Sequence, residues 1–196
     1  MNERKLQMFL NRVVLFLREK YEINVQFVDG FIGVNREVAE WRNNRMIVDI
    51  RERNTLAILF IVCHVFGHLV QYSTTRKYSD LLAIVNSRPL PLDLDDNFKQ
   101  RYFPYEEEAF QIGKGLMEQV FEVSTKLDRL YQVFMHADFE HYWNYLLTGK
   151  GSSRELFNRR FHQMQKDMMR SITSSFPSIK PPDILQRVNN IEIIVV

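Results

Sequence analysis

Residues 55–71 read TLAILFIVCHVFGHLVQ and include the longest apolar run of the chain. Either Asn54 or Thr55 can cap a helix at its start, and the pattern continues to about Tyr72. The apolar run from 56 to 70 is shorter than the ~20 residues that a membrane span needs, and it contains two histidines. The stretch therefore predicts a helix buried in the core of a soluble protein.

The residues before this helix predict a further helix and a small sheet. Apolar side chains recur at helical spacing between 4 and 21, with charges between them. Residues 23–28 alternate between apolar and polar, and the turn signal Asp29-Gly30 precedes a return strand at 31–34. Another short strand is expected at 46–50. We therefore expect an α+β fold, mainly helical, with a small and mostly antiparallel sheet.

The residues after the helix are expected to be helical for most of their length. A long connection at 86–104 precedes a helix from 105 to about 131. More helix is expected after it, to residue 147. Further segments are expected beyond it: a break at 148–153, a helix at 154–172, a linker at 174–182 and a strand-like tail at 191–196.

Composition and charge exclude several classes of protein. Apolar residues make up 45% and charged residues 26% of the 196 residues, which excludes a largely disordered chain. The net charge of +2 provides no overall positive field to hold nucleic acid. The single cysteine cannot form an internal disulfide, and the N-terminal sequence does not resemble a signal peptide. We therefore expect a cytoplasmic protein with no direct contact with nucleic acid or membrane.

The central helix carries His64 and His68, separated by one helical turn. Two histidines at i and i+4 lie on one helix face, so both imidazoles can reach one metal ion at ~2.0–2.1 Å. Two unpaired polar rings would be costly in an apolar helix, and a shared metal ion removes that cost. The alternative, which the pair alone leaves open, is two core histidines that bond to backbone or acidic groups.

The residue after His64 differs from the one found in active zinc peptidases. Helices with the pattern H-E-x-x-H bind zinc through both histidines and use the glutamate as general base. Here that position is Val65, which cannot accept a proton. The sequence therefore has no catalytic residue at the general-base position.

With these features, residues 55–71 resemble the zinc-binding helix of the ImmA/IrrE-type metallopeptidases, which typically ends in a phrase such as A-H-E-L-G-H. H-V-F-G-H keeps both histidines and the glycine. The resemblance covers about residues 1–120 and implies a zincin-like fold with zinc as cofactor. It also implies a third ligand from a later helix, in a pattern like E-x-x-A-N-x-F-A-x-x-L-L. Residues 106–117 match that pattern in outline, which makes Glu106 the third ligand.

Helical geometry ranks the neighbouring glutamates. Apolar side chains between 105 and 120 define a buried helix face, which Glu106 and Glu108 flank while Glu107 lies outside. We therefore rank Glu106 first and Glu108 second as metal ligand.

The resemblance also suggests how the chain is divided. Residues 1–123 would form the zincin-like domain, residues 124–173 a helical extension packed on it, and residues 174–196 a linker and tail. The tail at 191–196 has high β-propensity and one charge, so we expect it to add as an edge strand. Its partner would be the sheet of its own chain or that of a neighbour, which would make an oligomer.

The leading hypothesis is a degenerate zinc-metallopeptidase-like protein, without normal peptidase activity, that acts by binding a protein partner. Members of the family commonly act on helix-turn-helix repressors of mobile elements or stress responses, so the resemblance implies such a repressor as partner. One alternative is an active metal-dependent peptidase whose base comes from elsewhere, such as Glu108 or an acid in 86–104. The other is a metal-free protein-interaction domain in which both histidines are core residues.

Overall fold

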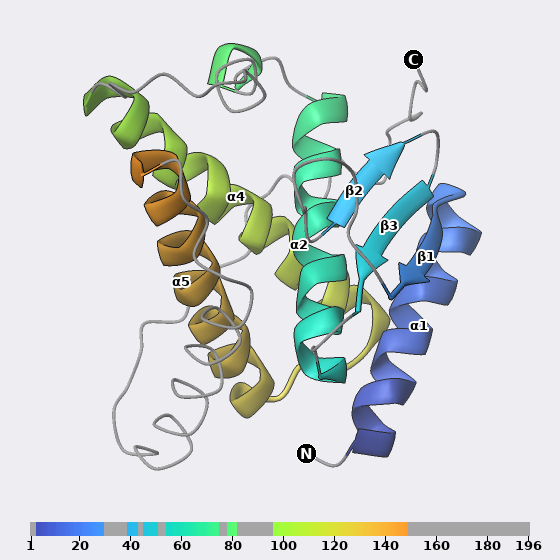
Figure 1. Ribbon diagram of the computed structural model, residues 1–196. Coiled ribbons are helices and arrows are strands. Elements are labelled where there is room, and N and C mark those ends of the chain that lie inside the picture. The colour runs from blue at the N-terminus through green and yellow to red at the C-terminus, as the bar shows by residue number, and fades with distance from the viewer. Residues whose placement is uncertain are drawn as a thin grey trace.

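The computed structural model describes residues 3–29, 39–42, 45–50, 54–74, 78–81 and 96–148. The return strand expected at 31–34, most of the connection at 86–104 and the segments expected beyond 148 lie outside these residues. In chain order the labelled elements are α1 (Glu3–Tyr21), β1 (Asn24–Val28), β2 (Ala39–Arg42), β3 (Arg45–Asp49), α2 (Thr55–Thr74), α4 (Asp96–Val120) and α5 (Thr125–Thr148) (Figure 1). The mixture of long helices and one small sheet confirms the α+β class.

Helix α2 is the centre of the fold, as its composition predicts. It contacts α1, α4, α5 and two strands of the sheet. Figure 1 shows α1 and the sheet on one side of α2, and α4 and α5 on the other. Its start is fixed by Asn54, whose side-chain oxygen accepts a hydrogen bond from the Ala57 amide at 2.8 Å. By length and composition α2 could cross a membrane, but 78% of its apolar window is buried inside the protein, as in the core helix of a soluble protein.

The sheet differs from the expected one. Its strand order is β1-β3-β2, and β3 pairs parallel with β1 and antiparallel with β2. The expectation of a mostly antiparallel sheet was therefore wrong. The strand at Ala39–Arg42 was not predicted, and it forms the antiparallel pair with β3. Because β3 lies beside β1, the chain must cross over before it enters the central strand.

The boundaries of α4 and α5 also differ from the prediction. Helix α4 begins at Asp96, so the last part of the expected connection is helical, and it includes Pro104. It ends at Val120, whereas a helix to 131 was expected. A new helix then begins, with the Ser124 hydroxyl oxygen accepting a hydrogen bond from the Leu127 amide at 3.3 Å. No glycine or proline marks this break in the sequence, which is why the periodic pattern was interpreted as continuous.

Helix α5 packs on the same core as α2. Its buried face continues the main hydrophobic cluster through Leu127, Leu130, Tyr131, Val133, Phe134 and Ala137. It therefore lies against the helices that carry the predicted metal ligands. The division of the chain at residue 123 stays a prediction.

Candidate metal centre

The two histidines of α2 face each other across one helical turn. His64 is buried and His68 is partly buried. Their rings meet edge to face with centroids 4.4 Å apart, and their Nε2 atoms are 3.0 Å apart. The i, i+4 spacing therefore brings both Nε2 atoms within reach of a single metal ion, as the sequence predicts.

Small residues at the crossing of α2 and α4 allow a third ligand to approach. A Cβ atom built on Gly67 would lie 2.0 Å from the Ala109 carbonyl oxygen, and one on Gly113 would lie 2.5 Å from the Cys63 carbonyl oxygen. Cys63 and Gly67 are one turn apart on α2, as are Ala109 and Gly113 on α4, so the two backbones touch along one turn of each helix. This contact requires a glycine at position 67, beside the second histidine.

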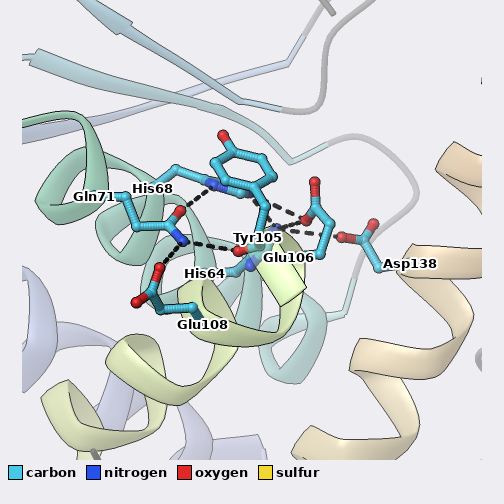
Figure 2. Close-up of polar contacts among 7 residues, drawn as sticks. All are labelled: His64, His68, Gln71, Tyr105, Glu106, Glu108 and Asp138. Carbon is cyan, nitrogen blue, oxygen red and sulfur yellow. Dashed lines mark hydrogen bonds and ion pairs between the residues drawn. The ribbon is translucent and has the colours of Figure 1, made fainter. Parts of the chain in front are cut away.

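The crossing places Glu106 against both histidines, one turn before Ala109. Its Oε2 atom lies 3.3 Å from His64 Nε2 and 3.3 Å from His68 Nε2. The side chain of Glu106 is 12% exposed. His64, His68 and Glu106 form the group of possible metal ligands found among the described residues, with all ligand atoms within 4.8 Å of one another. Figure 2 shows the three side chains converging from α2 and α4.

These separations suit a single tetrahedral ion. Bonds of about 2.0–2.1 Å in a tetrahedron place neighbouring donor atoms about 3.3–3.4 Å apart. The observed separations are 3.0, 3.3 and 3.3 Å. The two contacts of Glu106 are longer than the usual 2.7–2.9 Å or so of a charge-assisted hydrogen bond. Two imidazoles and a carboxylate are also a ligand set that zinc accepts.

A chain of hydrogen bonds fixes the orientation of His68. Its Nδ1 lies 3.0 Å from Gln71 Oε1, so a proton on Nδ1 is donated to that oxygen. The Gln71 amide nitrogen donates in turn to the Tyr105 carbonyl at 2.8 Å and to Glu108 Oε2 at 2.9 Å (Figure 2). With Nδ1 as the donor, the lone pair of His68 Nε2 faces His64 Nε2 and Glu106 Oε2. Outer contacts commonly orient metal-binding histidines in this way.

The second-ranked glutamate, Glu108, therefore has a different place. Its carboxylate contacts Gln71, which in turn holds His68, while Glu106 contacts both histidine Nε2 atoms. Gln71 was not singled out from the sequence. Its position three residues after His68 on the same helix was the signal that could have found it.

His64 is held mainly by packing. Its ring stacks on Phe110 of α4, with centroids 3.8 Å apart and planes 17° from parallel. Its Nδ1 atom is buried and has no hydrogen-bond partner among the described residues. Its Nε2 atom also lies 3.5 Å from Asp138 Oδ2 of α5, a residue that sequence reasoning missed. Nothing near Asp138 in the sequence marks it as a ligand, because its proximity arises from the packing of α5.

The charges of the site favour a positive charge near Glu106. Burial and the charge of His68 lower the pKa of His64 to about 4. Burial also lowers the pKa of His68, but the charge of Glu106 and hydrogen bonds with Glu106 and Gln71 outweigh it, so this pKa is raised. Burial raises the pKa of Glu106, yet the charge of His68 and hydrogen bonds from both histidines hold it below its usual range. The Glu106 carboxylate therefore stabilises positive charge beside the two imidazoles, which a proton on His68 or a metal ion would supply.

Cys63 and Val65, the residues before and after His64, are apolar neighbours of the site. Val65 is partly buried and packs against the main hydrophobic cluster. Cys63 is fully buried, and burial raises the pKa of its thiol. Among the described residues, the group of possible metal ligands does not include it.

Comparisons of the chain with models of protein families, with curated proteins and with solved structures find no match.

Proposed function

We propose that this chain is a zinc-binding, zincin-like protein related to the ImmA/IrrE-type metallopeptidases, and that it acts by binding a protein partner without normal peptidase activity. The observation that carries the proposal is the convergence of His64 Nε2, His68 Nε2 and Glu106 Oε2 within 4.8 Å. The family resemblance selects the same three residues from the sequence. The agreement of the resemblance with this convergence adds support for metal binding.

The donor set favours zinc over magnesium and calcium. Magnesium and calcium prefer sites built from oxygen atoms, whereas two of these three donors are imidazole nitrogens. A zinc ion held by these three residues alone would act as a Lewis acid and lower the pKa of a water in the fourth position. The protein supplies the orientation of the donors, through Gln71 for His68 and through Phe110 for His64.

The residues around the site argue against ordinary peptidase activity. Val65 cannot act as general base, and Glu108 accepts a hydrogen bond from Gln71, which already holds His68. General base catalysis contributes roughly 10²–10⁴-fold to a rate, so its loss leaves little hydrolysis. A binding role follows, and the resemblance suggests a cytoplasmic helix-turn-helix repressor of a mobile element or stress response as the partner.

A metal-free interaction domain is the second candidate, and one observation favours it. The raised pKa of His68 means that a proton on this ring can pair with Glu106 and satisfy the site without metal. In that case the three side chains form a buried ion pair, and the domain binds its partner without zinc.

Metal analysis of protein purified without added zinc separates these candidates. We expect close to one zinc per chain, and loss of most of it in His68→Ala and Glu106→Gln. Glu107→Gln and His136→Ala are matched controls on α4 and α5, outside the candidate ligand group, and both should keep their zinc. Wild-type protein with no transition metal, and no uptake on zinc addition, would overturn the proposal in favour of the metal-free candidate.

The binding role is tested separately with a purified helix-turn-helix repressor. We expect zinc-loaded wild-type protein to bind the repressor without cleaving it during prolonged incubation. Rapid cleavage by wild-type protein, abolished in His68→Ala, would refute the loss of peptidase activity and identify an active enzyme with a substitute base.

A further inference from the structure

Helix α5 brings one more carboxylate to the metal centre, that of Asp138. The ring of Phe134, one turn earlier on α5, lies 5.5 Å from that of Phe60. Phe60 is in turn one turn before His64 on α2. The two helices therefore run together through this contact, and Asp138 meets His64 one turn further along both. Figure 2 shows the Asp138 carboxylate pointing from α5 towards the histidines and Glu106.

The distance from Asp138 Oδ2 to His64 Nε2 is 3.5 Å. This is longer than a charge-assisted hydrogen bond of about 2.7–2.9 Å. It is close to the separation of about 3.3–3.4 Å between neighbouring donors of a tetrahedral zinc ion. The His64–Asp138 separation of 3.5 Å is 0.2 Å longer than the His64–Glu106 and His68–Glu106 separations, both 3.3 Å. Asp138 is outside the group whose ligand atoms all lie within 4.8 Å of one another, so its carboxylate must turn toward the other donors to bind the same ion.

We propose that Asp138 is the fourth protein ligand and closes the metal site. This inference rests on metal binding by His64, His68 and Glu106. Zinc sites with four protein ligands are structural, whereas catalytic sites keep one position open for water or substrate. A fourth protein ligand therefore gives a physical reason, independent of Val65, for a zinc protein that binds without hydrolysing.

The alternative role for Asp138 is that of a general base. A base acts on a water that itself occupies the fourth position, so its carboxylate lies one hydrogen bond beyond that position. The 3.5 Å between Asp138 Oδ2 and His64 Nε2 is compatible with both roles. A ligand closes the fourth position, whereas a base leaves that position open to water or to an external ligand. The side chain of Asp138 is 24% exposed.

The proposal also gives α5 a role in the site. The first three ligands come from α2 and α4, and the fourth comes from a helix that lies beyond the expected boundary at residue 123. Metal binding would then clamp α5 to the rest of the core. Helix α5 would be part of the metal domain, since the site is incomplete without it.

Cobalt substitution with an external chelating ligand tests the closed site. Co²⁺ takes the same ligands as zinc, and its visible spectrum reports their number and geometry. We expect acetohydroxamate to leave the spectrum of Co²⁺-loaded wild-type protein unchanged, since no position is open. In Asp138→Ala the spectrum should change on loading, and acetohydroxamate should shift it further. Zinc affinity should fall at least about tenfold, the lower end of the loss seen for residues that only support metal ligands.

Two further variants keep the result interpretable. Asp138→Asn preserves the shape of the side chain and should also weaken zinc binding, with its fold checked by circular dichroism. His136→Ala, an exposed residue on the same helix, should behave as wild type. A wild-type Co²⁺ spectrum that acetohydroxamate shifts as it does that of Asp138→Ala would overturn the fourth-ligand assignment but leave the metal site intact. Unchanged zinc affinity in Asp138→Ala would also overturn it. Wild-type protein that takes up neither Co²⁺ nor zinc would instead overturn the proposed function itself.

Discussion

The substitution Gly67→Ala tests whether the helix crossing builds the metal centre. A Cβ atom at position 67 would lie 2.0 Å from the Ala109 carbonyl oxygen, where ordinary contacts begin at 3.4 Å. Because that oxygen belongs to the backbone of α4, a side-chain rotation cannot relieve the overlap. Helix α4 must therefore move away from α2 by about 1.4 Å, or the backbone must distort.

The size of this movement decides the effect on metal binding. Glu106 is one turn from Ala109 and moves with it, so its present 3.3 Å separation from the histidine Nε2 atoms grows by up to the same amount, to at most roughly 4.7 Å. Two donors bound to one ion by bonds of about 2.1 Å cannot lie more than about 4.2 Å apart. Zinc affinity should therefore fall by an order of magnitude or more.

The effect on stability has two opposing parts. Alanine is favoured over glycine inside a helix by about 1 kcal/mol. Overpacking of a closed contact costs typically about 1–3 kcal/mol, so we expect net destabilisation of up to about 2 kcal/mol.

Zinc competition against a chromophoric chelator, with thermal unfolding of the metal-free protein, measures both quantities. Ser73→Ala, on the exposed part of α2, is the control, and it should change stability by no more than about 0.5 kcal/mol. Gly67→Ala protein with wild-type zinc affinity and unchanged unfolding temperature would refute the argument that the crossing positions Glu106.

Three further predictions follow from the sequence and the site. Gln71→Ala should weaken zinc binding about 10–100-fold, because the ring of His68 loses the partner that orients it. A titration against a chelator measures the zinc affinity, and wild-type affinity in the variant would contradict the role of Gln71. Val65→Glu alone should lower stability by about 1–3 kcal/mol and give no peptidase activity, because the fourth position of a closed site is taken. Val65→Glu combined with Asp138→Ala should give measurable hydrolysis of an unfolded protein. Equal activity of the single and the double variant would count against a closed site. Deletion of residues 190–196 should lower the unfolding temperature or dissociate an oligomer, as scanning calorimetry and light scattering would show; if neither changes, the tail is not an edge strand.

The local features of the sequence predicted the helices around the site well. The helical patterns at 4–21 and 55–72 correspond to α1 and α2. Of the two residues expected to cap α2, Asn54 is the one that does so. These predictions depend on interactions within a few residues, which periodicity and capping chemistry describe directly. The structure also brings His64, His68 and Glu106 together, as helix spacing and the family resemblance indicated.

Long-range pairing was the part that the sequence could not provide. The parallel pairing of β1 with β3 depends on where the chain crosses over, and no local pattern records that. The approach of Asp138 to His64 depends likewise on how α5 packs across the core. The end of α4 at Val120 was missed because Ser124, a weaker signal than glycine or proline, is the residue that caps the next helix.

The H-V-F-G-H sequence can be explained position by position from these contacts. His64 and His68 supply the two Nε2 atoms, and Gly67 is required by the 2.0 Å approach of the Ala109 carbonyl. None of these contacts depends on a carboxylate at position 65, where Val65 instead packs against the hydrophobic cluster. The architecture that would hold a metal ion is therefore separable from the general base that would use it. A chain that keeps the first and lacks the second can retain zinc for the stability and shape that a binding protein needs.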